Sequence, residues 1–249
     1  MSTAALLGLC VLVAGAFFTE AVVGFGATVL TVSFGAQLVP MDVVLPAFIP
    51  LNIVLSAFVI ARNVAFIDRR TLLRAIAPAV GVGTAVGMQL TALQRDRRLL
   101  IVFALFVCGV GVSELVRTLR ARPAPPLSRA TTLALLGAGG VVHGLFGAGG
   151  PLVVYATGRL MPDPRTFRAT LAVVWCALNV ALVLNYARLG TLTLQSARTS
   201  AALVPSLLVG ALAGDWAQSR VPLRAFRIAT AALLLTAGVS LALRNLLAS

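Results

Sequence analysis

Long apolar runs separated by short polar stretches make up most of this chain. They are Ala4–Leu38, Val43–Ile60, Leu72–Leu93, Leu99–Leu119, Leu133–Leu160, Phe167–Ala187, Ala197–Ala217 and Leu223–Leu247. A transmembrane helix needs about 20 mainly apolar residues. None of the runs shows the alternation of apolar and polar residues that a membrane-barrel strand requires. The pattern predicts an all-α polytopic membrane protein.

Two of these runs are interrupted by glycine. Gly24-Phe25-Gly26 cuts the first run, and the stretch from His143 to Pro151 contains four glycines before its proline. Continuous helix is disfavoured there, because glycine loses backbone entropy and proline cannot donate to the preceding turn. Broken helix inside a bilayer is tolerated only where protein surrounds it or it lines a cavity. Matched breaks in two halves of a membrane protein are typical of a transporter's binding site.

The two halves of the chain align as an internal repeat. Residues 127 positions apart match without a gap from Asn52 to Arg117, and upstream of this stretch the offset is 123. The matched pairs include Asn52 with Asn179, Pro78 with Pro205, Gly83 with Gly210, Gly87 with Gly214, Arg97 with Arg224, and Gly24 with Gly147. We assign residues 1–119 to repeat 1, residues 120–130 to a linker rich in proline and arginine, and residues 131–249 to repeat 2. Together they are expected to form one transport domain.

The arginines distinguish two topologies. If each broken helix crosses the membrane fully, the halves run parallel and the 20 basic residues, all arginine, divide 11 to nine. If each broken helix is re-entrant, the halves are inverted and only six arginines face one side: Arg95, Arg97, Arg98, Arg188, Arg198 and Arg244. The remaining 14 face the other side, which agrees with the excess of positive charge on cytoplasmic loops. We therefore predict two inverted repeats, each a re-entrant broken helix followed by three transmembrane helices, with both termini outside.

Composition excludes several other classes of protein. The chain is 59% hydrophobic with 11% charged residues and a mean hydropathy of +1.01, outside the range of soluble domains. Its net charge of +13 is spread over the polar stretches without a basic face that carries aromatics, so no nucleic-acid partner is expected. The three cysteines lie in separate runs, and neither a metal site nor a cofactor is predicted. A membrane enzyme is disfavoured, because HExxH, GxSxG and a carboxylate cluster are all missing from the sequence.

The two breaks are the first candidates for a substrate site. A half-helix N-terminus at membrane depth offers unpaired N–H groups and a partial positive charge, which suit an anion. Glycine also lets the backbone approach a ligand closely. The residues of the breaks predicted to bind substrate are Gly24, Phe25, Gly26, Gly147, Gly149 and Gly150. The alternative is that these glycines only let helices pack.

Glu20 and His143 occupy equivalent positions ahead of the two breaks. Ionisable groups in membrane segments are costly and usually face a cavity or a partner. A carboxylate and an imidazole would be able to exchange protons with both sides of the membrane, so both residues are candidates for proton coupling. Equally, either side chain would be able to cap the irregular backbone without titrating.

Asn52 and Asn179 are symmetric and uncharged, and their amides suit hydrogen bonding to an oxyanion; interhelical hydrogen bonding is the alternative. A second group of side chains is placed in the lining of the same cavity, with ordinary packing as the alternative. These are Thr28, Tyr155, Trp175 and Cys176.

At this point the pattern resembles the TauE/SafE family of sulfite exporters. The resemblance rests on Gly24-Phe25-Gly26, on Gly147-Ala148-Gly149-Gly150-Pro151-Leu152, and on the short basic loop from Arg62 to Asp68. It covers nearly the whole chain. It implies export of small sulfur-containing anions, such as sulfite or organosulfonates, across the plasma (inner) membrane of a bacterium. The sequence departs from the family pattern after Gly26, where Ala27-Thr28 replaces a fuller glycine run.

The expected function is therefore transport, without enzymatic activity, of a small organosulfur anion by alternating access with proton coupling. The partners are that anion and the lipid bilayer, with a homodimer left open. Three alternatives remain from the sequence: an importer of a small sulfur compound, a passive anion channel, and an accessory membrane subunit without a site of its own.

Overall fold

The computed structural model describes residues 3–23, 26–91, 93, 96–120, 127–161, 163–218, 220 and 222–247. Its α-helices are α1 (Thr3–Val23), α2 (Ala27–Leu38), α3 (Met41–Asn63), α4 (Arg69–Thr71), α5 (Ala77–Gln89), α6 (Arg97–Arg120), α7 (Arg129–Phe146), α8 (Gly150–Thr157), α9 (Pro164–Arg188), α10 (Leu194–Gln218) and α11 (Leu223–Leu247). A 3₁₀ turn, η1 (Val64–Phe66), follows α3, and a π-helical turn, η2 (Leu72–Ile76), joins α4 to α5. No described residue is in a strand.

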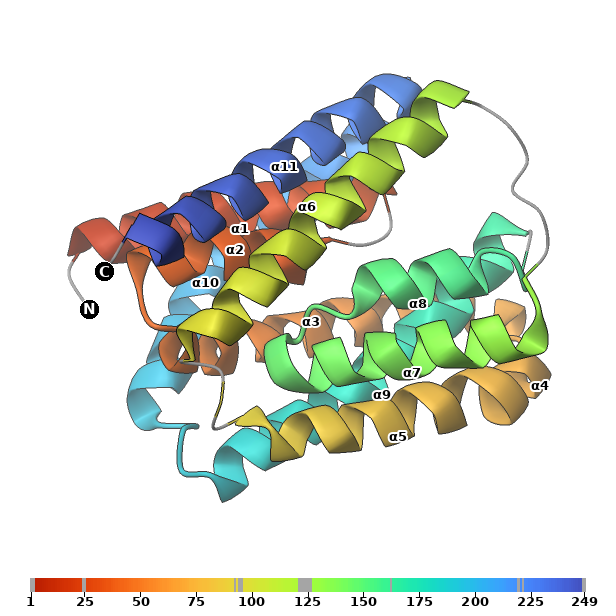
Figure 1. Ribbon diagram of the computed structural model, residues 1–249, viewed down its shortest axis with the longest axis horizontal. Coiled ribbons are helices and arrows are strands. Elements are labelled where there is room, and N and C mark those ends of the chain that lie inside the picture. The colour runs from red at the N-terminus through yellow and green to blue at the C-terminus, as the bar shows by residue number, and fades with distance from the viewer. Residues whose placement is uncertain are drawn as a thin grey trace. The chain divides into compact units, whose positions relative to one another are not determined.

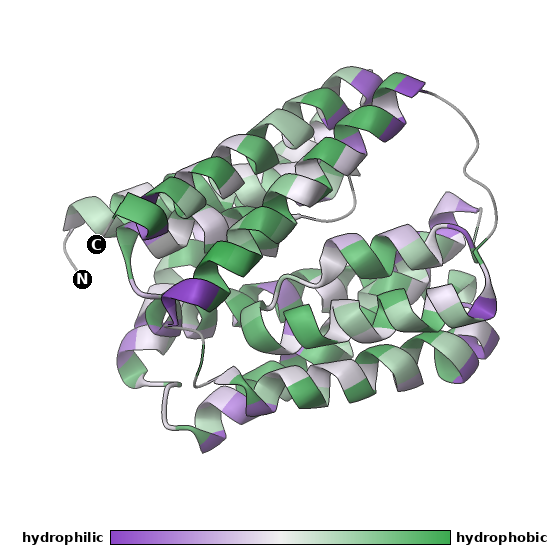
Figure 2. Cartoon of the chain, viewed as in Figure 1, coloured by the Kyte–Doolittle hydropathy of each residue, from purple (hydrophilic) through white to green (hydrophobic). Residues whose placement is uncertain are grey.

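Seven of the described helical segments are long and apolar enough to cross a membrane. They are Thr3–Val22, Met41–Phe66, Arg69–Gln89, Arg97–Arg120, Pro164–Arg188, Leu194–Ala217 and Arg227–Leu247. Hydrophobic residues cover the middle of these helices, and hydrophilic residues gather at helix ends (Figure 2). The predicted class, an all-α polytopic membrane protein, is confirmed.

The chain forms two compact units, and each contains segments from both halves of the sequence. Unit 1 consists of residues 1–44, 92–123 and 201–249, and unit 2 of residues 45–91 and 124–200. Unit 1 thus holds α1, α2, α6 and α11, whereas unit 2 holds α5, α7, α8 and α9 (Figure 1). Helices α3 and α10 contribute residues to both units.

Both predicted breaks turn the chain back on itself. In unit 1, a Cβ placed on Gly8 near the start of α1 would lie 3.4 Å from the side chain of Leu38 at the end of α2. In unit 2, a Cβ placed on Gly139 in α7 would lie 3.2 Å from the Cβ of Leu152 in α8. The first contact joins the start of α1 to the end of α2, and the second joins residues on either side of the α7–α8 turn, so the second helix of each pair runs back along the first and α1–α2 and α7–α8 are helical hairpins (Figure 1).

In unit 1, α6 and α11 pack against each other in a reciprocal way. A Cβ on Gly111 would lie 3.1 Å from the carbonyl oxygen of Ala231, and a Cβ on Gly238 would lie 2.9 Å from that of Ala104. Gly238 and Ala231 stand 127 positions after Gly111 and Ala104. The two helices therefore contact each other through the same repeat-matched residues. Later residues of α6 meet earlier residues of α11, and the two helices therefore run antiparallel (Figure 1).

Close helix–helix contacts at glycine also occur at equivalent positions in the two units, one in each. A Cβ on Gly83 of α5 would lie 2.1 Å from the carbonyl oxygen of Gly137 in α7, and one on Gly210 of α10 would lie 2.2 Å from that of Ala14 in α1. A side chain fits at neither position. The repeat-matched glycines Gly83 and Gly210 thus let one helix lie directly on the first helix of a hairpin in each unit.

In unit 2, the turn that follows α3 lies against the beginning of α9. The backbone N–H of Asp68 donates to Oγ1 of Thr170 over 2.9 Å. The guanidinium of Arg165 lies over the ring of Phe66, 5.7 Å from its centroid. The polar stretch after the second apolar run and the one before the sixth run therefore meet at one end of this unit.

Candidate functional site

The turn of the α7–α8 hairpin depends on glycine. Gly147 ends α7 with a φ of 64°, and its N–H donates to the carbonyl oxygen of His143. A Cβ on Gly149 would lie 1.8 Å from the carbonyl oxygen of Gly139, so only glycine fits where the second arm leaves the turn. Helix α8 then begins at Gly150, with Pro151 in its first turn, where a missing N–H has no consequence. The predicted break is confirmed at these residues.

Beside this turn, the buried residues His143 and Asn179 and the half-buried Trp175 form a group that we call the His143 cluster. The imidazole of His143 stacks on the indole of Trp175, with ring centroids 5.7 Å apart and planes inclined by 25°. Asn179 follows Trp175 by one turn of α9 and lies beside His143, but the geometry forms no hydrogen bond between them. His143 is 2% exposed and Asn179 is 3% exposed. The structure thus brings together three residues that the sequence proposed separately.

Three polar atoms of the His143 cluster are unusual because they are buried without hydrogen-bond partners among the described residues. Neither ring nitrogen of His143 nor Oδ1 of Asn179 has a hydrogen-bond partner in the described part of the chain. Leaving a buried donor or acceptor unpaired costs roughly 1–3 kcal/mol each. Buried polar groups are otherwise nearly always hydrogen-bonded. The cluster therefore has the donors and acceptors to hold a small polar ligand.

Thr84 is a further buried polar residue in the same unit, and the sequence did not identify it. It is 1% exposed, and its Oγ1 has no hydrogen-bond partner among the described residues. Its backbone nitrogen would lie 2.9 Å from a Cβ on Gly140 of α7, three residues before His143. One signal was available: Thr84 stands between two repeat-matched glycines, at a position where the second half has Ala211.

The turn of the α1–α2 hairpin is built differently. The backbone N–H of Ala27, the first residue of α2, donates to Oε2 of Glu20 over 3.1 Å. Gly26 precedes it with a φ of 110°, a conformation that favours glycine. A carboxylate at a helix N-terminus satisfies an unpaired donor and interacts favourably with the helix dipole. Glu20 therefore acts as a cap across the break, whereas His143 at the equivalent position stacks on an aromatic ring.

The remaining predicted site residues are placed as follows. Gly24 and Phe25 lie outside the described residues. Thr28 is half-buried on α2. Asn52 is 4% exposed on α3, and Cys176 is a half-buried free cysteine on α9.

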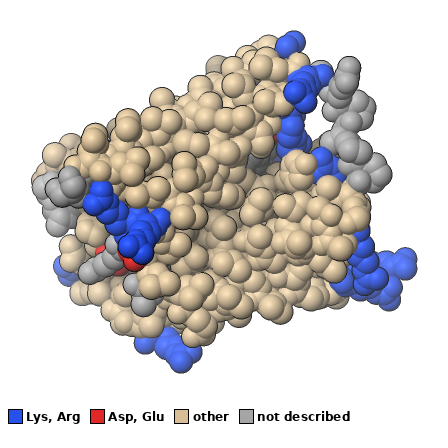
Figure 3. All heavy atoms as spheres, in the orientation of Figure 1, with Lys and Arg blue, Asp and Glu red and all other residues tan. Residues whose placement is uncertain are grey.

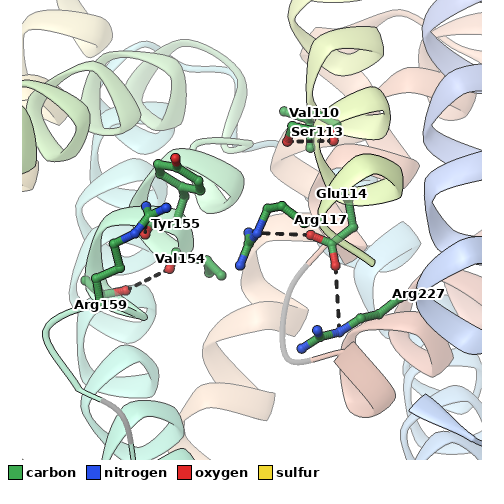
Figure 4. Close-up of polar contacts among 9 residues, drawn as sticks. Val110, Ser113, Glu114, Arg117, Val154, Tyr155, Arg159 and Arg227 are labelled. Atoms are coloured by element: carbon green, nitrogen blue, oxygen red, sulfur yellow. Dashed lines mark hydrogen bonds and ion pairs between the residues drawn. The ribbon is translucent and has the colours of Figure 1, made fainter. Parts of the chain in front are cut away.

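Tyr155 lies on α8, away from the turn of its hairpin. The guanidinium of Arg159 covers its ring, 3.9 Å from the centroid (Figure 4). The described part of the chain contains no group of three or more histidine, cysteine, aspartate or glutamate side chains that would hold a metal ion.

An all-helical multi-pass chain with two glycine-turned hairpins, and with unpaired polar atoms buried beside one of them, has the architecture of a membrane transporter. The comparison with known families identifies the kind of transporter. The family described as "Sulfite exporter TauE/SafE" matches residues 7–241, and the chain belongs to it. No curated protein and no solved structure gives a match. The predicted resemblance is confirmed, and with it a membrane transporter of the type that exports sulfite and related sulfur anions.

Proposed function

We propose that this protein exports a small sulfur oxyanion, sulfite or an organosulfonate, by proton-coupled alternating access. The observation that supports the proposal is the His143 cluster, in which buried polar atoms without partners lie beside a glycine turn. The amide of Asn179 donates to one oxygen of the anion through its NH₂ group, and His143 donates to another. Trp175 provides an apolar face that suits the carbon or sulfur side of the ligand.

His143 is our candidate for proton coupling. A positively charged imidazole buried beside an indole and without an anion is strongly disfavoured, because nothing offsets its desolvation. An oxyanion in contact with the ring provides the compensating charge. The proton and the anion are therefore expected to occupy the cluster together and to cross the membrane in the same direction, so that the outward concentration gradient of the anion drives export.

Alternating access requires two structural elements that exchange roles, and we infer that the repeats are inverted. The antiparallel, reciprocal packing of α6 on α11 supports this, because an axis that interchanges antiparallel helices is perpendicular to them. For membrane-crossing helices, such an axis lies in the membrane plane. The contact between Asp68 and Thr170 also supports it, since these two polar stretches lie on one side of the membrane only if the α7–α8 break between them is re-entrant.

The test is flux of radiolabelled sulfite in proteoliposomes, with and without a pH gradient, and with sulfoacetate, taurine, thiosulfate and sulfate as competitors. We expect saturable flux that increases with the gradient and is inhibited by one of the oxyanions. His143→Gln is expected to remove the dependence on the gradient, and Asn179→Ala to raise KM about tenfold, consistent with the loss of one hydrogen bond to a charged ligand.

Cys176→Ser is the matched control, because it changes a half-buried side chain on α9 between Trp175 and Asn179. It is expected to leave both flux and gradient dependence unchanged. Flux that does not saturate and ignores the gradient would favour a passive anion channel. No flux of any sulfur anion would refute the substrate assignment.

A further inference from the structure

A group of charged side chains lies in unit 1, where the C-terminal end of α6 meets the N-terminal end of α11. Glu114 of α6 is 7% exposed. One of its carboxylate oxygens is 3.6 Å from Nη1 of Arg117, and the other is 3.7 Å from Nε of Arg227 (Figure 4). These distances define ion pairs that are too long to be hydrogen bonds. One carboxylate is thus shared by two guanidinium groups.

Further arginines lie at the same end of the helix pair. The antiparallel register that places Gly111 against Ala231 and Glu114 against Arg227 also brings Arg120, the last residue of α6, to within about one helical turn of the level of Arg224. Both of these side chains are exposed. We call Glu114, Arg117, Arg120, Arg224 and Arg227 the α6–α11 charge cluster. Four arginines against one carboxylate leave an excess of three positive charges.

Two buried hydroxyl groups adjoin the ion pairs. Thr118 follows Glu114 by one helical turn, and Thr230 follows Arg227 by one turn, so each lies on the same helix face as its charged neighbour. Thr118 is 8% exposed and Thr230 is 1% exposed. Neither Oγ1 atom has a hydrogen-bond partner in the described part of the chain. Hydroxyl donors and guanidinium groups together match the oxygens of a phosphate ester.

The position of the cluster along the helices indicates which kind of phosphate ester it would bind. It lies at the end of two membrane-length helices, which is where lipid headgroups are found. In the same unit, Trp216 of α10 is 60% exposed, and Arg220 stacks over its ring at 4.4 Å. Exposed tryptophan and arginine of this kind are typical of the membrane–water interface. On the face shown in Figure 3, the charged atoms lie in separate groups, and most of the visible surface of each unit is uncharged.

We propose that the α6–α11 charge cluster binds the phosphate of an anionic phospholipid headgroup, with Arg117 and Arg227 bridging between Glu114 and the phosphate. The exposed Arg120 and Arg224 contribute long-range attraction at the rim. This site is separate from the His143 cluster, which belongs to unit 2, and it does not depend on the proposed transport function.

The experiment is a binding titration of the full-length protein in neutral detergent with a fluorescent short-chain phosphatidylglycerol. Phosphatidylcholine of the same chain length, glycerol 3-phosphate and inorganic phosphate are the competitors. We expect unlabelled phosphatidylglycerol to displace the probe and the other three to do so at least about tenfold less well. Equal displacement by phosphatidylcholine, or by either soluble phosphate, would overturn a site for anionic lipid.

Three variants make the assignment specific. Arg120→Gln/Arg224→Gln leaves the ion pairs intact and is expected to weaken binding about 25-fold, or about fivefold per arginine. Arg188→Gln/Arg198→Gln removes the same charge from exposed positions in unit 2 and is expected to leave affinity unchanged. Glu114→Gln frees both arginines for the phosphate and is expected to tighten binding several-fold. Equal loss in the two double variants, or weaker binding by folded Glu114→Gln, would refute the site.

Discussion

At the scale of single residues, the two ionisable groups ahead of the breaks make different contacts. The sequence places Glu20 and His143 at matched positions but does not distinguish a proton carrier from a cap. The distinction depends on where the next backbone N–H points, and only the folded turn defines that. In the structure, Ala27 donates to Glu20, and the nitrogens of His143 remain unpaired among the described residues.

Two variants of Glu20 test whether its side chain caps the N-terminus of α2. Glu20→Gln retains an oxygen that accepts from Ala27, so we expect folding, flux and gradient dependence to persist. Glu20→Ala leaves the N–H unpaired and is expected to lower stability by about 1 kcal/mol. Thermal unfolding and sulfite flux in proteoliposomes measure both effects. If folded Glu20→Gln transports sulfite but ignores the pH gradient, Glu20 is the proton carrier and the assignment of His143 is wrong.

Two aspartates outside the membrane-spanning segments cap helices in the same way. Asp68 accepts from the backbone N–H of Thr71 over 3.0 Å, and Asp163 accepts from that of Thr166 over 2.8 Å. Hydrogen bonds from the threonine side chain and then its backbone N–H hold the pKa of each carboxyl below its usual value. The motif Asp-x-Arg-Thr occurs at both positions and was readable in the sequence.

These caps predict a pH dependence with a definite sign. Because the folded pKa of each carboxyl is depressed, its stabilisation is complete above the unfolded value, near pH 4, and is lost as pH falls through the folded value. Asp68→Asn is therefore expected to unfold more easily than the parent protein at pH 7, and the difference should shrink below pH 4. Melting temperatures measured from pH 3 to 7 test this. A difference that grows on acidification would contradict it.

At the scale of helices, the apolar runs predicted where the elements lie. The run at Leu223–Leu247 coincides with α11, and that at Leu99–Leu119 lies within α6. The runs do not reveal which face of a helix contacts which neighbouring helix, because apolar residues occur on every face of these helices. For that reason the sequence did not reveal which partner Thr84 faces, although its place between two repeat-matched glycines was visible. The π-helical turn at Leu72–Ile76 was also missed, since the run continues through it without a break.

Glycines on one face of α7 provide the prediction at this scale. A Cβ on Gly140 would lie 2.3 Å from the carbonyl oxygen of Val80 in α5, whereas one on Gly137 would come no closer than 3.9 Å to any such atom. Gly140→Ala must therefore separate α5 from α7, at a cost of roughly 1–3 kcal/mol. It should also displace His143 and reduce sulfite flux.

Gly137→Ala is the matched control on the same helix, where alanine improves helix propensity without a clash. Unfolding midpoints and flux of the two variants are the measurements. Equal effects of the two substitutions would show that close packing of α5 on α7 does not determine the site.

At the scale of the whole molecule, sequence and structure contribute different evidence on topology. The sequence offers a repeat with an offset of 127 residues and an arginine count of 14 against six, which favours re-entrant breaks but does not reveal which residues of the two arms of a hairpin meet. The hairpins become apparent only from contacts such as that of Gly8 with Leu38. Contacts across the halves, such as Gly83 on Gly137, join residues too far apart in sequence to be predicted from local patterns.

The inverted topology makes a prediction that differs from that of parallel repeats at two specific loops. Inverted repeats place Arg70 and Arg165 on the same side of the membrane and Arg188 on the opposite side. Parallel repeats with fully crossing breaks place Arg165 opposite Arg70, with Arg188 on the side of Arg70. Single cysteines introduced as Arg70→Cys, Arg165→Cys and Arg188→Cys, after replacement of Cys10, Cys108 and Cys176 by serine, distinguish the two arrangements.

Labelling intact cells with a membrane-impermeant maleimide is the measurement, and labelling after permeabilisation shows that each cysteine is reactive. We expect only Arg188→Cys to react in intact cells, because positive charge favours the cytoplasmic side for the other two. The contact of Asp68 with Thr170 supports the same grouping, since it places the segments that contain Arg70 and Arg165 at one end of unit 2. Reaction of Arg165→Cys alone would refute inverted repeats and, with them, the inference that the two repeats exchange roles during alternating access.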